Sequence, residues 1–298
     1  MFSESVTRFK SWGRRSGLAA PLRWLYILTH ISDLYFQSQR LNQEMIRLRH
    51  AFPELMVEPD VPFSVIVEAP PWLARAEQRI GKSVAQMTAQ EKQTSFYTYF
   101  SEIWGEGYER LILKRQYEAY LPLLPFDSDD PWLDIGCGAG EFIRFLGEKG
   151  IPAVGVDMNI QEVARAQSRG LNVQQAEATS FLRETKQNYR GISLLEVIEH
   201  IPVEAILPLL EMAVNRLASG GVLLVETINL NHPLALNGFY TDPTHIRPVP
   251  VDYLEFVLQW LGLVNVKTVY TSPLWLPGID VNSVRQIYYT YALVGVRP

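Results

Sequence analysis

The chain has 298 residues, 47% of them hydrophobic, and a formal net charge of −5. This length suggests one large domain or one domain with an accessory part, and this composition supports a sizeable core. The acidic balance excludes an overall basic surface, so no nucleic-acid partner is expected. The single cysteine, Cys137, excludes a disulfide framework and a cysteine-based metal site, and it fits the reducing cytoplasm.

A basic arm is expected at the amino-terminal end. Residues 1–50 hold eight Lys and Arg residues against three Asp and Glu residues, a net charge of +5. Residues 21–50 have a helical pattern in which Leu34, Leu41 and Leu48 recur seven apart. Three interpretations stay open: a helix packed on its own domain, a coiled coil that pairs two copies, or an amphipathic helix on the inner face of the plasma membrane.

The next segment changes from proline-rich to aromatic. Residues 51–90 lack clear periodicity before Trp72, and we predict a Pro-rich linker there. A helical pattern rich in aromatic residues follows, and across 91–125 we predict a helical cap over a cofactor site. The prolines of the linker are Pro53, Pro59, Pro62, Pro70 and Pro71.

After Pro131 the chain alternates between strand and helix patterns. This alternation predicts an α/β fold with a mostly parallel sheet, helices on both faces and an antiparallel last strand. Gly220-Gly221 is expected to end the fourth helix and start the fifth strand. Strands are expected at 131–135, 152–157, 171–175, 191–196, 221–227, 264–270 and 286–296, and helices at 139–149, 160–169, 178–185, 203–218 and 250–262.

A glycine-rich turn joins the first strand to its helix. Gly136, Gly138 and Gly140 allow a ligand to approach the backbone closely, and the start of the following helix offers free N–H groups. The second strand ends in Asp157, about twenty residues later, where an acid suits ribose hydroxyls. NAD and S-adenosylmethionine both fit these features. Asp134 before the glycines and the Gly-x-Gly-x-Gly spacing favour S-adenosylmethionine.

Five spaced blocks resemble the class I S-adenosylmethionine-dependent methyltransferases: residues 133–140, Val156-Asp157, Ala176-Glu177-Ala178, Glu199-His200 and Gly220-Gly221. The resemblance covers about 126–298 and implies a methyltransferase domain there, with a Rossmann-like sheet of seven strands, the last antiparallel, behind an N-terminal helical extension. It implies that the glycine loop lies against the methionyl part of the cofactor, that Asp157 holds the ribose and that Glu177 contacts the adenine amine. The implied cofactor residues are Asp134, Gly136, Gly138, Gly140, Asp157, Met158, Glu177, Ala178 and Glu196.

A narrower resemblance involves Tyr97-x-x-Phe100-x-Glu102 and the segment 239–248, Phe-Tyr-x-Asp-Pro-Thr-His-x-Arg-Pro. These motifs are similar to bacterial methyltransferases of surface polysaccharide (O-antigen) assembly, in which the segment before the first strand folds over the cofactor. The resemblance implies a glycan or lipid-linked sugar substrate and a glycosyltransferase partner. It makes Tyr97 and Lys114 or Arg115 candidate lid residues. Trp104-Gly105 departs from the pattern, in which an Arg before the Gly is common.

The end of the fourth strand carries a second chemical cluster. If a helix begins here, Glu196, Glu199 and His200 share one face and supply half of an octahedral site for a divalent metal. His245 is the first candidate for a fourth ligand and His232 the second. The arrangement resembles metal-dependent methyltransferases of RNA ribose hydroxyls or of ring hydroxyls in quinone precursors. The competing interpretation is a metal-free site in which the histidine orients the loop.

The segment 227–250 reads as a long loop at the carboxyl edge of the sheet, where ligands bind in open α/β folds. We expect Tyr240 and Arg247 to bind substrate, because an arginine suits an anionic sugar or phosphate. His200 or His245 is the expected base for a hydroxyl acceptor.

The sequence therefore predicts an S-adenosylmethionine-dependent O-methyltransferase that acts on a sugar hydroxyl or phosphate of a bacterial glycan. Two alternatives remain. One is a metal-dependent O-methyltransferase of RNA ribose or of a quinone-type small molecule. The other is a non-catalytic, cofactor-binding scaffold whose arm recruits glycosyltransferases to the membrane.

Overall fold

The computed structural model describes residues 68–102, 112–125, 130–274 and 284–298, together with Arg40, Gln43 and Ile66. The chain divides into two compact units, residues 1–70 and 71–298, and the second carries the whole sheet. Most of the predicted basic arm, with its three leucines, and Trp104-Gly105 lie outside the described residues. No helix in the described ranges is long and apolar enough to cross a bilayer.

The second unit begins with helices where a linker was expected. The Pro-rich linker predicted over 51–90 is wrong from Trp72 onward, since two helices and a turn occupy most of that stretch. A capping box starts the longer helix: the Thr88 side chain accepts from the Glu91 N–H, and the Glu91 carboxylate accepts from the Thr88 N–H. The elements are α3 (Trp72–Ile80), the 3₁₀ turn η2 (Val84–Gln86) and α4 (Ala89–Ser101).

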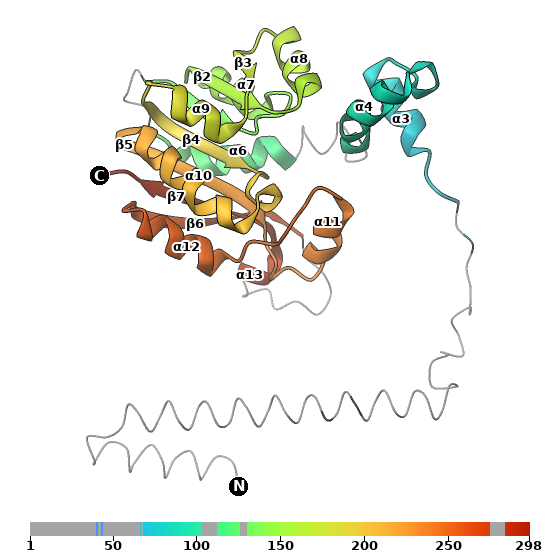
Figure 1. Ribbon diagram of the computed structural model, residues 1–298. Coiled ribbons are helices and arrows are strands. Elements are labelled where there is room, and N and C mark those ends of the chain that lie inside the picture. Colours follow the sequence, from blue (N-terminus) through green and yellow to red (C-terminus); the bar gives the residue numbers. More distant parts are fainter. Residues whose placement is uncertain are drawn as a thin grey trace. The chain divides into compact units, whose positions relative to one another are not determined.

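A seven-stranded sheet forms the centre of the unit, in the order β3-β2-β1-β4-β5-β7-β6 (Figure 1). β1 pairs in parallel with β2 and β4, whereas β7 pairs antiparallel with both β5 and β6. The predicted class I topology, with only the last strand antiparallel, is confirmed. The strands are β1 (Trp132–Ile135), β2 (Ala153–Asp157), β3 (Val173–Gln175), β4 (Tyr189–Leu195), β5 (Leu217–Ile228), β6 (Val264–Pro273) and β7 (Tyr288–Val296).

Helices cover both faces of this sheet, because alternate residues of buried strands point to opposite faces. Leu133 and Ile135 of β1 pack into one core cluster with α10 and α12, whereas Trp132 packs into another with α6 and α7. Figure 1 shows α9, α10 and α12 on the near face. The helices are α6 (Lys114–Tyr120), α7 (Glu141–Glu148), α8 (Ile160–Ser168), α9 (Ala178–Glu184), α10 (Val203–Arg216), α11 (Ala235–Thr241), α12 (Val251–Trp260) and α13 (Val284–Ile287), with 3₁₀ turns η4 (Leu121–Leu123) and η5 (Ile198–His200).

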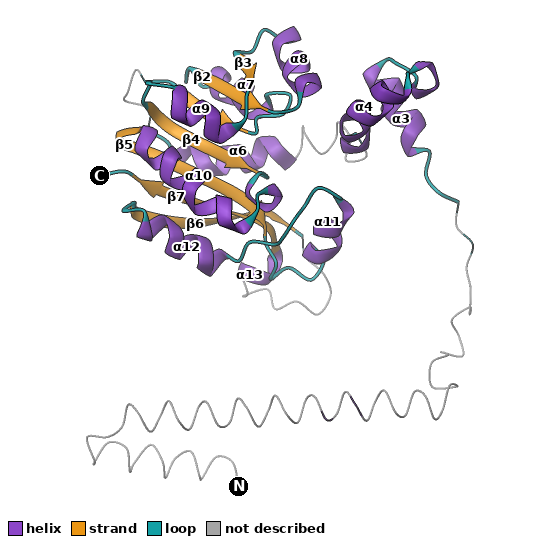
Figure 2. Cartoon of the chain, viewed as in Figure 1, coloured by secondary structure: helices purple, strands orange, loops and turns teal. Residues whose placement is uncertain are grey.

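Two boundaries differ from the sequence prediction. β5 begins at Leu217 rather than 221, because Leu217 already pairs with Tyr189 before the register shifts. Gly220-Gly221 therefore lies within β5 and does not end the preceding helix. The segment 227–250 is not an irregular loop throughout, since it contains α11 at the carboxyl edge of the sheet (Figure 2).

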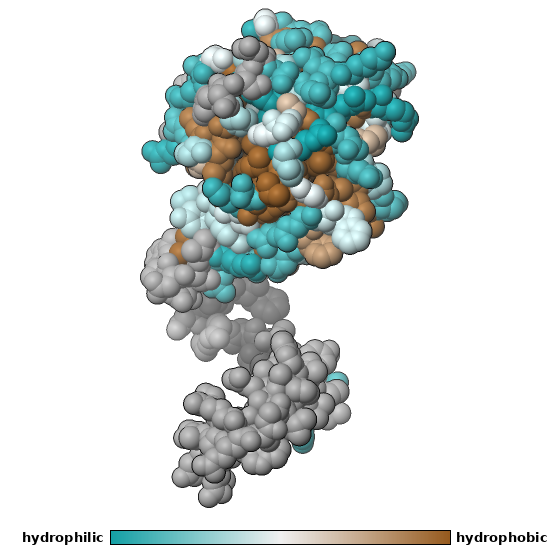
Figure 3. Space-filling model, turned by 90° about the vertical axis from the view of Figure 1, so that its left-hand side faces the viewer, coloured by the Kyte–Doolittle hydropathy of each residue, from teal (hydrophilic) through white to brown (hydrophobic). Residues whose placement is uncertain are grey.

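Figure 3 shows one face of the molecule, on which hydrophobic residues gather in one continuous area. More than half of the accessible surface of a folded protein is contributed by apolar atoms. This area by itself therefore identifies no functional site.

Candidate active site

A cavity of about 760 Å³ opens where β1, β2 and β4 end. Ligands of open α/β sheets bind at this carboxyl edge. The cavity brings together residues from six separate stretches of the chain, between Tyr97 and Thr244. The predicted residues that line it are Gly136, Gly138, Asp157, Met158, Glu177, Ala178, Glu196 and His200.

The glycine loop has the shape of a ligand cradle. Gly136 and Gly138 adopt φ values of +69° and +51°, which side chains disfavour. A Cβ on Gly136 would lie 2.5 Å from Cγ2 of Val197, whereas a Cβ on Gly138 would stand in open space. The Gly138 N–H donates to Oδ2 of Asp157 at 2.9 Å, which holds the loop beside the end of β2. The open side of Gly138 faces the cavity and leaves room for a cofactor against the backbone.

Asp134 and Gly140 do not line this cavity. Asp134 faces a separate hollow of about 120 Å³, where Ser193 donates to its Oδ1 at 2.6 Å and burial raises the pKa of the carboxyl to about 7. Gly140 caps α7 with φ +85°, and a Cβ there would lie 2.5 Å from Cδ1 of Leu171. Gly140 is thus needed for close packing of the chain. A contact of either residue with the cofactor stays a prediction.

Glu177 is the helix cap of α9. Its carboxylate accepts the backbone N–H groups of Thr179 and Ser180, each at 2.8 Å. Partial burial acts to raise the pKa of Glu177, but the hydrogen bonds from Thr179 and Ser180 outweigh it and lower that pKa to about 2. Glu177 lines the cavity while its carboxylate is already bonded, so the adenine contact stays a prediction.

The end of β4 differs from the predicted helix. Glu196 has the left-handed φ of +53°, and only the short 3₁₀ turn η5 follows. The left-handed residue breaks the helical spacing that was expected to align Glu196 with Glu199 and His200. Glu196 is outside the group of candidate metal ligands, which contains Glu199, His200 and His245. The structure thus brings together three of the four predicted ligands, and a metal contact of Glu196 stays a prediction.

Glu196 neighbours two buried acids, Glu199 and Glu226 of β5, and the second of these had not been expected from the sequence. Gln116 and Tyr120 of α6 both donate to the Glu226 carboxylate. Burial, and then the charges of neighbouring acids, raise the pKa of Glu196 and of Glu226 well above the ordinary value. The signal in the sequence was an acid that directly follows the apolar run 222–225 in a strand pattern.

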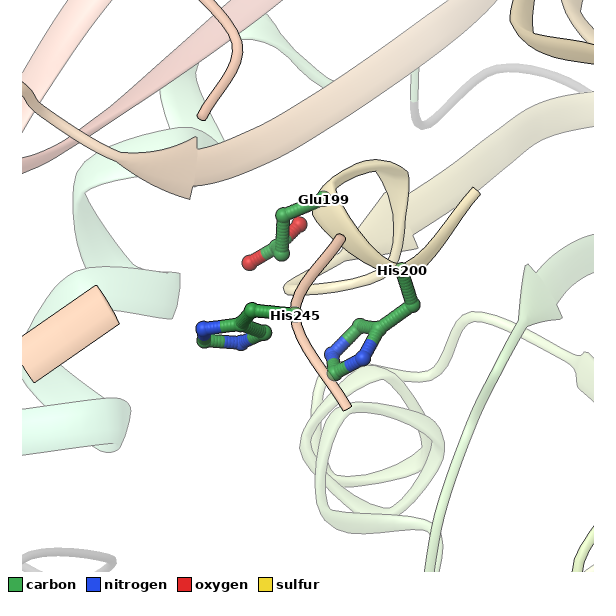
Figure 4. A group of neighbouring side chains, drawn as sticks. All are labelled: Glu199, His200 and His245. Carbon is green, nitrogen blue, oxygen red and sulfur yellow. The ribbon is translucent and has the colours of Figure 1, made fainter. Parts of the chain in front are cut away.

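Glu199, His200 and His245 form a compact group (Figure 4). One potential ligand atom from each lies within 4.8 Å of the other two. Glu199 is fully buried, and neither of its carboxylate oxygens forms a hydrogen bond of good geometry among the described residues, although the Glu196 carboxyl and the Thr227 hydroxyl lie close enough to affect its pKa. Burial raises the pKa of Glu199 to about 7. A buried carboxylate without partners is costly, and a cation beside it would remove that cost.

Hydrogen bonds fix the ring of His200. The Thr244 hydroxyl donates to Oδ1 of Asp242 at 2.6 Å, so its oxygen accepts from Nδ1 of His200 at 2.9 Å. Tyr97 of α4 donates to the other oxygen of Asp242 at 3.0 Å. Burial, and then the neighbouring His245, lower the pKa of His200. His200 is therefore a neutral imidazole with a free Nε2 lone pair.

The other two described histidines have different roles. Nδ1 of His245 donates to the Phe239 carbonyl at 2.7 Å, which leaves its Nε2 free as well. His232 uses both nitrogens: Nδ1 accepts from the Leu234 N–H at 3.1 Å and Nε2 donates to the Leu274 carbonyl at 2.8 Å. His232 is therefore excluded as a ligand, whereas a backbone-anchored ring such as His245 is typical of metal ligands.

The remaining predicted side chains lie apart from the cavity lining, with one exception. Tyr97 lines the cavity, as the lid prediction required. Tyr240 is 73% exposed on α11 and does not line it. Arg247 is half-buried, and its backbone N–H bonds to the Glu199 carbonyl at 3.4 Å. Lys114 and Arg115 are exposed on α6 and lie outside the cavity lining, so the structure gives no lid contact for them. Thr244 was missed, and its only signal was the turn motif Asp-Pro-Thr.

Comparison with known proteins gives the family. A sequence model of a methyltransferase domain matches residues 107–268, more than half of the chain. A solved S-adenosylmethionine-dependent methyltransferase from Archaeoglobus fulgidus is 27% identical, with a TM-score of 0.60 over 68% of this chain and 100% of that one. The magnesium protoporphyrin IX methyltransferase of Synechocystis, solved with bound S-adenosylhomocysteine, shares the fold at 16% identity and a TM-score of 0.52, over 70% of this chain and 97% of that one.

The curated relatives match this chain over only part of their own length. A ubiquinone biosynthesis O-methyltransferase of Saccharophagus degradans is 31% identical over 143 residues, 43% of this chain and 60% of that protein. One from Pseudomonas fluorescens is 29% identical over 105 residues, 33% of this chain and 44% of that protein. The chain thus spans less than two thirds of these relatives. By its family and its fold, the chain belongs to the class I S-adenosylmethionine-dependent methyltransferases.

Proposed function

We propose that the chain is a metal-assisted O-methyltransferase whose acceptor is a hydroxyl group of a small molecule. The observation that carries the proposal is the buried Glu199 carboxylate, with two unpartnered oxygens, next to His200 and His245. One carboxylate and two imidazoles suit a borderline divalent cation such as Mn²⁺ or Zn²⁺. Such a cation acts as a Lewis acid that lowers the pKa of a nearby hydroxyl.

The cavity residues support S-adenosylmethionine as the methyl donor. Its positively charged sulfur makes the methyl group open to in-line attack by an acceptor oxygen, so the protein mainly aligns the two partners. The bare backbone at Gly138 leaves space for the cofactor, and Asp157 stands where an acid suits ribose hydroxyls. His200 lines the same cavity, which ties the candidate cation site to the cofactor site.

The two histidines have one role each in this proposal. Both Nδ1 atoms are engaged in hydrogen bonds, so Nε2 is the atom that each ring offers to a cation. A nitrogen that binds a cation cannot accept a proton at the same time. His200 and His245 are therefore ligands here, and they replace the general base that the sequence analysis assigned to one of them.

The second part of the proposal concerns which molecule accepts the methyl group. The curated relatives are O-methyltransferases of ubiquinone biosynthesis by name, which supports an aromatic hydroxyl as the first choice. The glycan acceptor that the sequence favoured has support only from the motifs around Tyr97 and His245. Tyr240, expected to bind that substrate, is exposed away from the cavity lining.

Methyl transfer from S-adenosylmethionine to a catechol and to a methyl glycoside would test the acceptor, with and without a chelator. We expect transfer to the catechol that a chelator abolishes and Mn²⁺ restores. Transfer that the chelator leaves unchanged would reject the metal, and transfer to the glycoside alone would reject the aromatic acceptor. Calorimetry with Mn²⁺ tests the cation site: Glu199→Gln should lose binding, whereas the control variant Glu162→Gln, at a buried acid of the same cavity outside the ligand group, should keep it.

A further inference from the structure

The helices before the sheet carry an apolar groove that the methyl-transfer site does not use. It has a volume of about 380 Å³ and lies along α3, η2 and α4. Three of its side chains are unusually exposed for their type: Trp72 at 44%, Leu73 at 54% and Phe96 at 59%. Met87 and Phe100 line the same groove. Exposed apolar groups that gather in one place mark interaction surfaces, unlike single ones.

The acids around this groove are all engaged. Each carboxylate from residue 71 to residue 102 accepts a hydrogen bond from a neighbour. Glu91 and Glu102 pair with cations, whereas the described donors to Glu77 are neutral and leave its charge in place. These pairs are Glu77 with Ser83 and Val84, Glu91 with Lys82 and Thr88, and Glu102 with Arg79 and Arg165.

Two cations beside the groove have no such partner. The Arg75 guanidinium lies 5.3 Å from the centre of the Trp72 ring, and Lys92 lines the groove itself. Within the described ranges, neither forms an ion pair with a carboxylate. Among the described residues of α3, η2 and α4, these two cations stand against one carboxylate without a cationic partner, Glu77, so the net charge left at the groove is positive, next to an exposed tryptophan. Aromatic and basic residues on one helical surface are typical of the boundary of anionic membranes.

We propose that the α3–α4 surface docks on an anionic phospholipid bilayer. Trp72, Leu73 and Phe96 enter the boundary between headgroups and acyl chains, and Arg75 and Lys92 bind the lipid phosphates. The surface is directly joined to the active site, because Tyr97 follows Phe96 on α4, lines the cavity and bonds to Asp242. The docking surface is distinct from the basic arm over 1–50 and is independent of the acceptor proposed above.

Flotation of the full chain with vesicles tests the proposal. We expect binding to vesicles that contain phosphatidylglycerol, and little binding to phosphatidylcholine alone. Trp72→Ala with Leu73→Ala should weaken binding about tenfold or more, as expected for the loss of two inserted side chains. Arg75→Gln and Lys92→Gln should each weaken it about fivefold, the effect of one cation near an anionic surface.

Matched controls come from α12. Phe256 and Trp260 are 62% and 70% exposed and lie outside the groove. Their alanine variants should bind vesicles as the wild type does. Equal loss in these controls would overturn the proposal, and so would unchanged binding in the groove variants.

Hydrogen exchange of the wild type gives a second reading that needs no variant. Anionic vesicles should protect amides of residues 72–101, and unchanged exchange there would also overturn the proposal. Calorimetry with S-adenosylmethionine checks that the groove variants are folded. If a groove variant does not bind S-adenosylmethionine, its vesicle binding is not counted, and hydrogen exchange of the wild type decides whether the proposal stands.

Discussion

Glu199→Gln removes a buried negative charge whose two oxygens have no hydrogen-bond partner. Burial raises the pKa of Glu199 from 4.5 to about 7. Because the folded protein disfavours the ionised form, its free energy of unfolding falls as the pH rises from about 4.5 to about 7. This pKa difference corresponds to a fall of about 3 kcal/mol in the free energy of unfolding. Without metal and at about pH 8, we therefore expect the glutamine variant to be more stable than the wild type by up to about 3 kcal/mol.

A divalent cation should reverse this order. At a cation concentration about 100 times Kd, the wild type gains about 2.7 kcal/mol from binding. The variant lacks the carboxylate and should gain little. Glu162→Gln is the control, because Glu162 is a buried acid of the same cavity with a raised pKa that lies outside the ligand group. It should respond to the cation as the wild type does.

Urea unfolding with a chelator or with Mn²⁺, at about pH 5 and about pH 8, measures these differences. Only the difference between variant and wild type is informative, since Glu196 and Glu226 also have raised pKa values. An equal gain from Mn²⁺ in the wild type and in Glu199→Gln would refute the cation site. A metal-free variant that is less stable than the wild type would refute the argument from the unpartnered carboxylate.

Three other changes test the neighbouring parts of the site. Asp157→Ala should abolish binding of S-adenosylmethionine by calorimetry, and an unchanged affinity would reject the cofactor assignment. Thr244→Val removes the hydroxyl that holds His200 and should lower metal affinity or turnover about 10- to 100-fold. The free energy of unfolding should fall by only about 1 kcal/mol. Full turnover in this variant would show that the His200 ring needs no such anchor. Gly136→Ala should destabilise the protein by about 2–4 kcal/mol in chemical denaturation, because of its positive φ and its contact with Val197. Adding Val197→Ala should recover part of that loss, and no recovery would attribute the whole effect to the backbone.

Short-range patterns determined the fold from the sequence. Apolar runs of strand length, separated by helical patterns, predicted the sheet and its antiparallel last strand, and the glycine loop with Asp157 predicted the cofactor edge. These signals are readable because each depends on neighbours a few residues apart. Trp72, which begins α3, shows the limit, since the prolines before it concealed a helical pattern.

The tertiary structure alone decided which side chains can act together. The sequence placed Glu196, Glu199 and His200 on one helical face, but the left-handed backbone at Glu196 breaks that helix, and Glu196 lies outside the group of candidate ligands although its carboxyl still neighbours that of Glu199. It ranked His245 above His232 without a physical reason. The fold supplies that reason, because His232 has both nitrogens bonded to the backbone while His245 keeps one free. Burial, tautomer and unpartnered charge depend on contacts between residues far apart in the chain, and only the folded chain brings those residues together.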